Sequence, residues 1–229
     1  MMRSAAVLGA LALSASAFAV QANPIVGLFN TGAGLAAGQV DPHYSFSQGS
    51  GTATGSGGFG VVAADNVWPV NPWLANTTTS KWIAPSAQAG QSYDPSRNGT
   101  YSWTLSFDLS GYLPSTAWIK GNWAADNLGR VLFNGIEVSS SSSADSFTSF
   151  TPFLIASGFN AGVNTLSFEV VNLAQNGGNP TGLRTLFDSD VARNPQFVTG
   201  ISSVPEPGTW ALTLTGLAAL AAFARRRRA

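Results

Sequence analysis

The chain has a single histidine and no cysteine, which limits the reactions that its side chains could catalyse. A Ser-His-Asp triad would have to use His43, and no G-x-S-x-G segment supplies a nucleophilic serine on a strand-to-helix turn. Zinc sites need several histidine or cysteine ligands, so a zinc centre is not expected. The sequence therefore favours a packed or hydrogen-bonded structural role for His43.

Carboxylates and amides are the remaining candidates for chemistry. Glycoside hydrolysis needs two facing carboxyl groups, but no acidic pair stands out by its position, so a glycan hydrolase is kept only as an alternative. Asp126 and Asn127 in ADNLGR, or Asp188 and Asp190 in FDSD, could supply oxygen ligands for calcium. Asp and Asn are equally typical of polar turns, which is the favoured interpretation. No cofactor is expected, although a structural calcium ion is compatible with these residues.

Exposed tryptophans could bind sugars, because a sugar ring can stack on a large aromatic face. Trp103 belongs to an alternating apolar run and Trp118 adjoins Ile119, so both are expected in the core. Trp68 and Trp73 lie between prolines in NVWPVNPWLAN and are the better candidates for a glycan-binding surface. Packing over one end of the domain is nevertheless the favoured interpretation for this pair.

The elements that would position these residues are predicted to be β-strands. The segment TYSWTLSFDL alternates large apolar with polar residues, the period-two pattern of a strand with one buried face. The dipeptide Asn134-Gly135 between the apolar runs of RVLFNGIEV is a strong hairpin signal. Further β-rich runs are SFTSFTPFLI, GVNTLSFEVVN and GLRTLFDS.

These runs predict an all-β fold, an antiparallel β-sandwich of jelly-roll type formed by residues 23–203. No stretch of this body shows a sustained helical period. Two low-complexity segments, residues 47–58 and 138–146, are expected to be loops. The body carries six basic and ten acidic residues without a basic run, so nucleic acid is not an expected partner.

Both ends of the chain carry the marks of export. Residues 1–22 contain one basic residue, an apolar run and then small residues, the pattern of a signal peptide cleaved after Ala22 or, as the alternative, after Ala19. At the other end, residues 204–229 begin with Pro205, Glu206 and Pro207, which should interrupt the preceding chain.

An apolar run from Trp210 to Ala224 and four arginines, Arg225 to Arg228, complete this tail. As a helix the run would rise about 23 Å, short of the roughly 30 Å hydrocarbon core of a bilayer. A short transmembrane helix is therefore expected, with the arginines as its cytoplasmic anchor. The alternative to a sorting tail is an ordinary membrane anchor.

The Pro-Glu-Pro motif, apolar helix and terminal arginine cluster together resemble the PEP-CTERM sorting signal of Gram-negative bacteria. The resemblance implies recognition by exosortase, a membrane-embedded protease, and cleavage at or near the Pro-Glu-Pro motif while the chain is held at the inner membrane. Segments of the body, among them WLANTTTSKWIAP and GNWAADNLGRVLFNG, resemble a galactose-binding-domain-like jelly roll of PEP-CTERM proteins. Domains of that kind often bind glycans through loops at one end and many hold calcium.

The sequence as a whole therefore predicts an exported, non-catalytic protein of the cell surface or extracellular matrix. A carbohydrate-binding module is the first alternative and a glycan hydrolase the second. Extracellular polysaccharide is the expected ligand if there is one.

Overall fold

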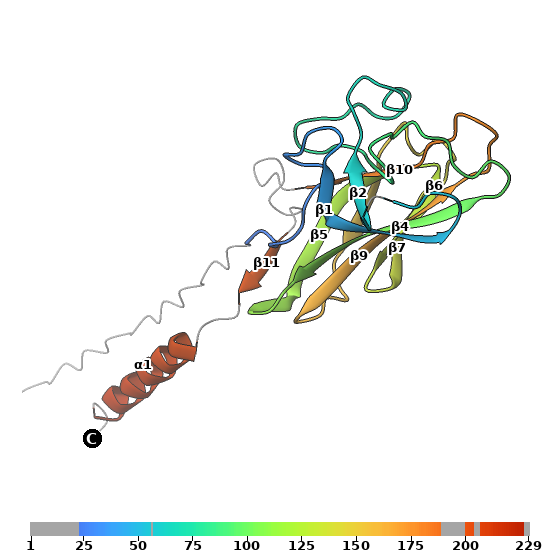
Figure 1. Cartoon of the computed structure of the whole chain (residues 1–229). Helices are drawn as coiled ribbons and strands as arrows, with labels where there is room; N and C mark the ends of the chain where they lie inside the picture. The colour runs from blue at the N-terminus through green and yellow to red at the C-terminus, as the bar shows by residue number, and fades with distance from the viewer. Residues whose placement is uncertain (1–22, 56, 189–199, 204–206, 227–229) are drawn as a thin grey trace, which may run out of the picture.

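The computed structural model describes residues 23–55, 57–188, 200–203 and 207–226, which form eleven strands and one helix (Figure 1). The predicted signal peptide, residues 1–22, lies outside the described residues. The elements in chain order are β1 Val40–Ser50, β2 Phe59–Val62, β3 Ile83–Ala84, β4 Gly99–Asp108, β5 Tyr112–Asp126, β6 Leu128–Phe133, β7 Ile136–Ser140, β8 Thr151–Ile155, β9 Val163–Asn172, β10 Gly182–Phe187, β11 Gly200–Ser203 and α1 Pro207–Arg226.

The strands pair in the order β11-β5-β10-β3-β2-β1-β4-β9-β6-β7, and β8 pairs with β5. Every described strand pair is antiparallel. The sheet curls on itself, so that β5, β8, β10 and β11 form one layer and β1, β4, β9, β6 and β7 form the other (Figure 1). The predicted all-β antiparallel sandwich is confirmed, with short β2 and β3 joining its layers.

The main core lies between the two layers. The five alternating apolar residues predicted to share one face of β4 and its end are all buried: Tyr101, Trp103, Leu105, Phe107 and Leu109. From the same layer, Phe168 of β9 meets Trp123 of β5 across the core, with ring centroids 6.5 Å apart. Burial of such large side chains is the main source of stability in a domain without disulfides.

The predicted hairpin at Asn134-Gly135 is confirmed between β6 and β7. Both residues have positive φ, 49° at Asn134 and 84° at Gly135, the backbone that a two-residue hairpin requires. The runs predicted around β8, β9 and β10 are strands as well.

Three details differ from the sequence prediction. The longest strand, β5, was not predicted, because Pro114 and Gly121 interrupt its pattern and its continuous buried face begins only at Ala117. Trp118 is only partly buried, since successive residues of β5 face opposite sides and Ile119 takes the core side. In addition, β1 extends to Ser50 and β7 to Ser140, each into one of the two segments expected to be loops.

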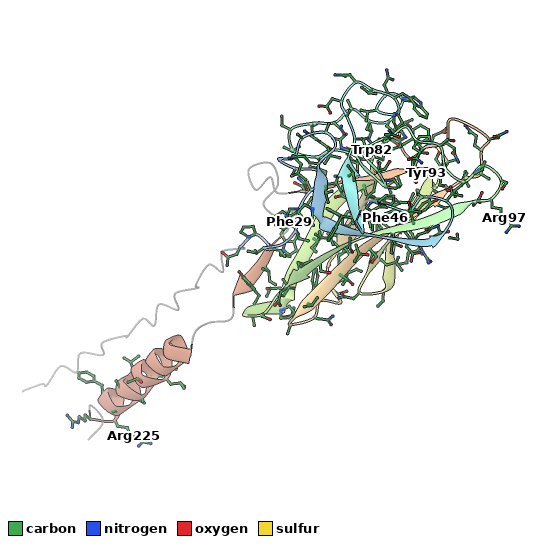
Figure 2. All side chains as sticks on the ribbon, in the orientation of Figure 1. Phe29, Phe46, Trp82, Tyr93, Arg97 and Arg225 are labelled. Atoms are coloured by element: carbon green, nitrogen blue, oxygen red, sulfur yellow. The ribbon has the colours of Figure 1, made fainter. Side chains whose placement is uncertain are left out.

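A second, smaller core covers the outer side of β10 and the end of β5. It is formed by Ala63, Val70, Trp73, Trp82, Ala84, Ala89 and Ala124, with Leu74, Phe147 and Phe150 packed against them. Figure 2 shows Trp82 among the loops over this side of the sandwich. The buried Arg184 of β10 donates hydrogen bonds to Ser80 Oγ (2.9 Å) and to the carbonyl of Ala75, which fastens the 74–80 loop to the sheet.

The two ends of the body meet at one edge. Asn23 and Ile201 exchange backbone hydrogen bonds of 2.9 Å and 3.0 Å, and β11 pairs with the start of β5. The helix predicted from residue 210 begins earlier, at Pro207, because proline is tolerated at the first helical position. In the part of the chain that the structure describes, no helix has both the length and the hydropathy to cross a membrane. The expectation of a transmembrane helix is thus not supported.

Candidate functional site

A pocket at the loop end of the sandwich brings together the two tryptophans and the Asp-Asn pair that the sequence analysis considered separately. It has a volume of about 170 Å³. We call it the Trp68 pocket; its lining is Trp68, Pro69, Pro72, Trp73, Asp126, Asn127, Phe147, Gln175, Gly178, Asn179 and Pro180. Four segments build it: the loop after β2, the end of β5, the loop between β7 and β8, and the turn between β9 and β10.

Trp68 forms the exposed aromatic wall of this pocket, with 46% of its surface accessible. Its ring lies against the backbone of Gly90, where an added Cβ would stand only 2.7 Å from Cε3 of the indole. Pro69 and Pro72 flank the tryptophan in the same lining. Gly90 and the two prolines therefore support the Trp68 ring, and the exposed part of the ring stays accessible to a ligand.

Trp73 occupies a different position, since only 3% of it is accessible. Its indole Nε1 donates a hydrogen bond to Oδ2 of Asp126 over 2.9 Å, and its ring lies 4.4 Å from that of Trp82. Trp73 thus belongs to the second core and orients the carboxyl group of Asp126, so any stacking surface in this pocket comes from Trp68.

Asp126 is the acidic group of the pocket. The pKa of its carboxyl group is raised to about 7: burial is the main cause, the hydrogen bond from Trp73 opposes it, and the charge of Asp145 adds to the rise. Thr181 donates its hydroxyl hydrogen to the backbone carbonyl of Asp126 over 2.7 Å and fixes the end of β5. Near neutral pH the carboxyl group can therefore act as hydrogen-bond donor or acceptor.

Amide side chains supply further polar groups around the pocket. Asn127 Oδ1 accepts a hydrogen bond from the backbone N–H of Leu173 over 2.9 Å. Asn179 is buried and donates from Nδ2 to the carbonyl oxygens of Tyr93 and Leu173. The sequence analysis missed Asn179 and Gln175; the only available signal was the turn-forming segment AQNGGNP.

An aromatic face, one carboxyl group and several amides match the surface of a sugar, which offers an apolar ring face and a rim of hydroxyl groups. Calcium fits less well at this place. Ca²⁺ takes six to eight oxygen ligands, whereas Asp126 is bonded to Trp73 and Asn127 Oδ1 to Leu173. No group of three acidic, histidine or cysteine side chains gathers among the described residues. The side chains of Asp126 and Asn127 thus bond to other segments of the chain and not to their own backbone.

The other candidate residues lie elsewhere. His43 Nδ1 is 3.0 Å from Oδ1 of the buried Asp41, and its ring stacks on Phe29 at 3.6 Å. Among the described residues, no serine hydroxyl is hydrogen-bonded to the ring of His43. Asp188 pairs with Lys120 over 3.4 Å. Asp190 lies outside the described residues.

Only part of the predicted sorting signal is described. Pro207 is the first residue of α1, and Arg225 and Arg226 end the helix, exposed to solvent. Pro205 and Glu206 lie outside the described residues. The same holds for Arg227 and Arg228.

Comparison with known proteins bears on the tail and the fold. Residues 203–228 match the PEP-CTERM protein-sorting motif, which indicates an exported protein. Similar solved structures include a family 29 carbohydrate-binding module (11% identity, TM-score 0.31, covering 69% of this chain and 86% of that one). Another is a family 35 module from an environmental isolate (10% identity, TM-score 0.31, covering 73% and 97%). The sequence has no match among curated proteins. Because both structural likenesses are remote, only this chain's own residues bear on what its pockets bind.

Proposed function

We propose that this protein is an exported, non-catalytic component of the cell surface or extracellular matrix of a Gram-negative bacterium, delivered through its C-terminal sorting tail. The observation that carries the proposal is the match of residues 203–228 to the PEP-CTERM motif. The signal peptide, residues 1–22, directs export. An exosortase-type membrane protease then recognises the tail at the inner membrane and cuts at or near Pro205, Glu206 and Pro207.

The arrangement of the folded body supports this order of events. The tail follows β11, which pairs with the first half of β5, whereas the Trp68 pocket includes Asp126 at the last residue of β5. The 15 residues of β5 extend over roughly 45 Å at the usual rise of a strand. While the tail holds the protein at the membrane, the pocket is therefore at the far end of the domain, and the loops gather on that side (Figure 1).

The tail's arginines provide the test of sorting. Replacing Arg225 to Arg228 by glutamine should abolish delivery to the surface, because these arginines end the segment that matches the sorting motif. Cell fractionation and immunoblotting follow the variant, and Arg130→Gln on the surface of β6 is the control for a lost charge in the folded body. Unchanged delivery of the tail variant would contradict recognition of the tail as a sorting signal.

We further infer that the Trp68 pocket binds carbohydrate, with extracellular polysaccharide as its ligand. The observation that favours this function is the exposed, supported ring of Trp68 beside the carboxyl group of Asp126 and the amide of Asn127. A sugar would stack its ring face on Trp68 and place its hydroxyl groups against these polar side chains. Cooperation of one aromatic platform with a few convergent polar groups is typical of ligand pockets.

Glycan-array binding followed by calorimetry tests this inference. Trp68→Ala should abolish binding with little loss of stability, because the side chain is half exposed. Phe29→Ala, which removes an exposed aromatic outside the pocket lining, is the matched control. Binding that survives Trp68→Ala would contradict the site. Turnover of the bound glycan, lost in Asp126→Asn, would instead show that the protein is a hydrolase.

A further inference from the structure

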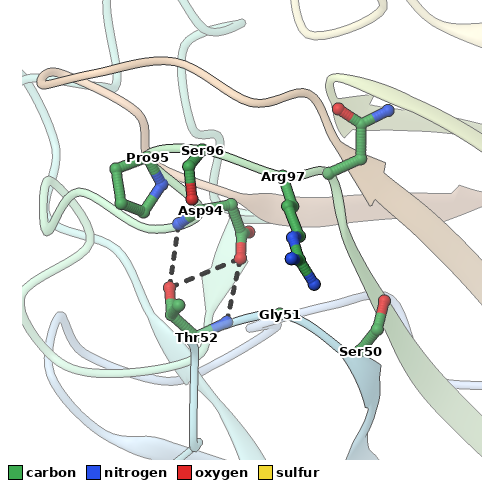
Figure 3. A pocket seen from close by; sticks show the side chains of 8 residues that line it. Ser50, Gly51, Thr52, Asp94, Pro95, Ser96 and Arg97 are labelled. Carbon is green, nitrogen blue, oxygen red and sulfur yellow. Dashed lines mark hydrogen bonds between the residues drawn. The ribbon is translucent and has the colours of Figure 1, made fainter.

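A second pocket lies between the loop after β1 and the segment that precedes β4 (Figure 3). We call it the Arg97 pocket; its lining is Ser50, Gly51, Thr52, Asp94, Pro95, Ser96, Arg97 and Asn98. Its volume is about 270 Å³. None of these residues was singled out by the sequence.

The inner wall of the Arg97 pocket is fixed by the buried Asp94. Its Oδ1 accepts hydrogen bonds from the backbone N–H of Thr52 (2.8 Å) and more distantly from the Thr52 hydroxyl (3.4 Å). Its Oδ2 accepts from the hydroxyl of Tyr101 (2.7 Å) and from Nδ2 of Asn172 (2.9 Å). Four donors thus hold this carboxylate, and the wall that carries it is rigid.

Arg97 is the charged group that faces the opening. Figure 3 shows its side chain extending from the segment after Asp94 toward Gly51 and Ser50. Asp94 is held by other donors, and no ion pair of Arg97 occurs within the described ranges. The guanidinium group therefore keeps its planar fork of N–H donors for a ligand, beside the hydroxyl of Ser96.

The Arg97 pocket and the Trp68 pocket adjoin each other. The backbone N–H of Gln175, which lines the Trp68 pocket, donates to the carbonyl of Asp94 over 3.2 Å. The neighbouring Ala174 donates from its N–H to Oδ1 of Asn98, in the lining of the Arg97 pocket, over 2.9 Å. One hydrogen-bonded pair of segments therefore forms the wall that the two pockets share.

The two pockets differ in the charged groups that line them. The lining of the Trp68 pocket contains the buried Asp126 and no lysine or arginine, so it offers a sugar carboxylate no cationic partner. The Arg97 pocket contains the exposed Arg97 and a carboxylate, Asp94, that four donors already hold. The Arg97 pocket offers the fork geometry that pairs with a carboxylate through two parallel hydrogen bonds.

We propose that the two pockets are adjacent subsites for one acidic polysaccharide, with a neutral sugar on Trp68 and the carboxylate of a neighbouring uronic acid on Arg97. The proposal rests on carbohydrate binding by the Trp68 pocket and adds the chemical class of the ligand. A polymer with separated acidic units satisfies both pockets. A wholly neutral polymer leaves Arg97 without a partner, and a continuous polyuronate places a carboxylate in the Trp68 pocket, whose lining has no cationic side chain.

Gellan oligosaccharides are a suitable probe, since their repeat places one glucuronic acid among neutral sugars. Calorimetry at low salt would compare them with the same oligosaccharides after reduction of the carboxyl group to an alcohol. The full-length protein should bind the acidic form about tenfold more tightly than the reduced form, because one charge-assisted bidentate contact is gained. Arg97→Gln should bind both forms equally, with the affinity that the wild type has for the reduced form.

Two controls separate this inference from the proposed function. Arg130→Gln changes the net charge by the same amount on β6, outside both linings, and should keep the tenfold preference. Trp68→Ala should bind neither the acidic nor the reduced gellan oligosaccharides. If the wild type binds both forms equally, or Arg97→Gln keeps the preference, the acidic subsite is wrong while carbohydrate binding stands. If the wild type binds neither gellan form nor any neutral glycan, carbohydrate binding and the subsite both fail.

Discussion

The indole Nε1 of Trp73 donates a hydrogen bond to Oδ2 of Asp126 over 2.9 Å and ties the loop after β2 to the end of β5. This contact joins the second core to the Trp68 pocket, because Trp73 is buried against Trp82 while Asp126 reaches the pocket lining. The pocket is therefore shaped by a packed layer of side chains below it.

Asp126 should make the stability of the body depend on pH. Burial raises the pKa of its carboxyl group from 3.8 to about 7, so the folded state binds the proton more tightly than the unfolded state. Between about pH 4 and pH 7 the free energy of unfolding should then fall as the pH rises, by at most about 4 kcal/mol. Chemical denaturation at several pH values measures this.

The variant Asp126→Asn keeps an oxygen acceptor for Trp73 but cannot ionise, so this part of the pH dependence should disappear. Asp108→Asn is a control at an exposed acid, where hydrogen bonds from Ser110 lower the pKa. A pH dependence in Asp126→Asn equal to that of the wild type would show that Asp126 is not the group responsible.

The core between the layers should depend on Trp103. Its side chain is fully buried, and truncation of such a residue typically costs about 3–5 kcal/mol, a large part of a domain's 5–15 kcal/mol. Thr104 lies on the other face of β4, where its hydroxyl is 2.8 Å from that of Ser167. Thr104→Ala should cost under about 1 kcal/mol. Similar denaturation midpoints for Trp103→Ala and Thr104→Ala would contradict the placement of Trp103.

The position of the Trp68 ring should depend on the absence of a side chain at Gly90. In Gly90→Ala the new methyl group would overlap the indole, so the ring must move and glycan affinity should fall severalfold. Gly162→Ala is the matched control, because nothing lies within 4 Å of its added Cβ. Calorimetry of the two variants compares them; equal affinities would show that the support from Gly90 does not matter.

Local patterns were sufficient to predict much of the fold. Strict alternation identified β4, and Asn134-Gly135 identified the hairpin of β6 and β7, because both signals act between neighbours in the chain. The strand β5 was missed because Pro114 and Gly121 disturb its alternation, although it pairs with three other strands. Its place depends on those long-range pairings.

The candidate site shows the same limit. Trp73 was a candidate for a glycan-binding surface and Asp126 a candidate calcium ligand, with packing and a polar turn as the favoured interpretations, and the two were considered at separate places. Their contact spans 53 positions of sequence and exists only because the loop after β2 folds over β10 and the end of β5. Arg97 could not be predicted as a site residue, because a single arginine in a turn has no sequence pattern around it. Its role depends on the residues that line the pocket in the folded structure.

The mass of the intact protein at the cell surface tests the account most directly. Removal of the signal peptide and of the sorting tail predicts a chain that begins at Asn23 and ends between Ser203 and Pro207, without the helix and arginines that follow. The folded body should limit trimming at both ends, since Asn23 and Ile201 are paired. Mass spectrometry of the surface fraction should find that species. A surface protein that still ends at Ala229 would contradict sorting by cleavage and leave the tail as an ordinary anchor.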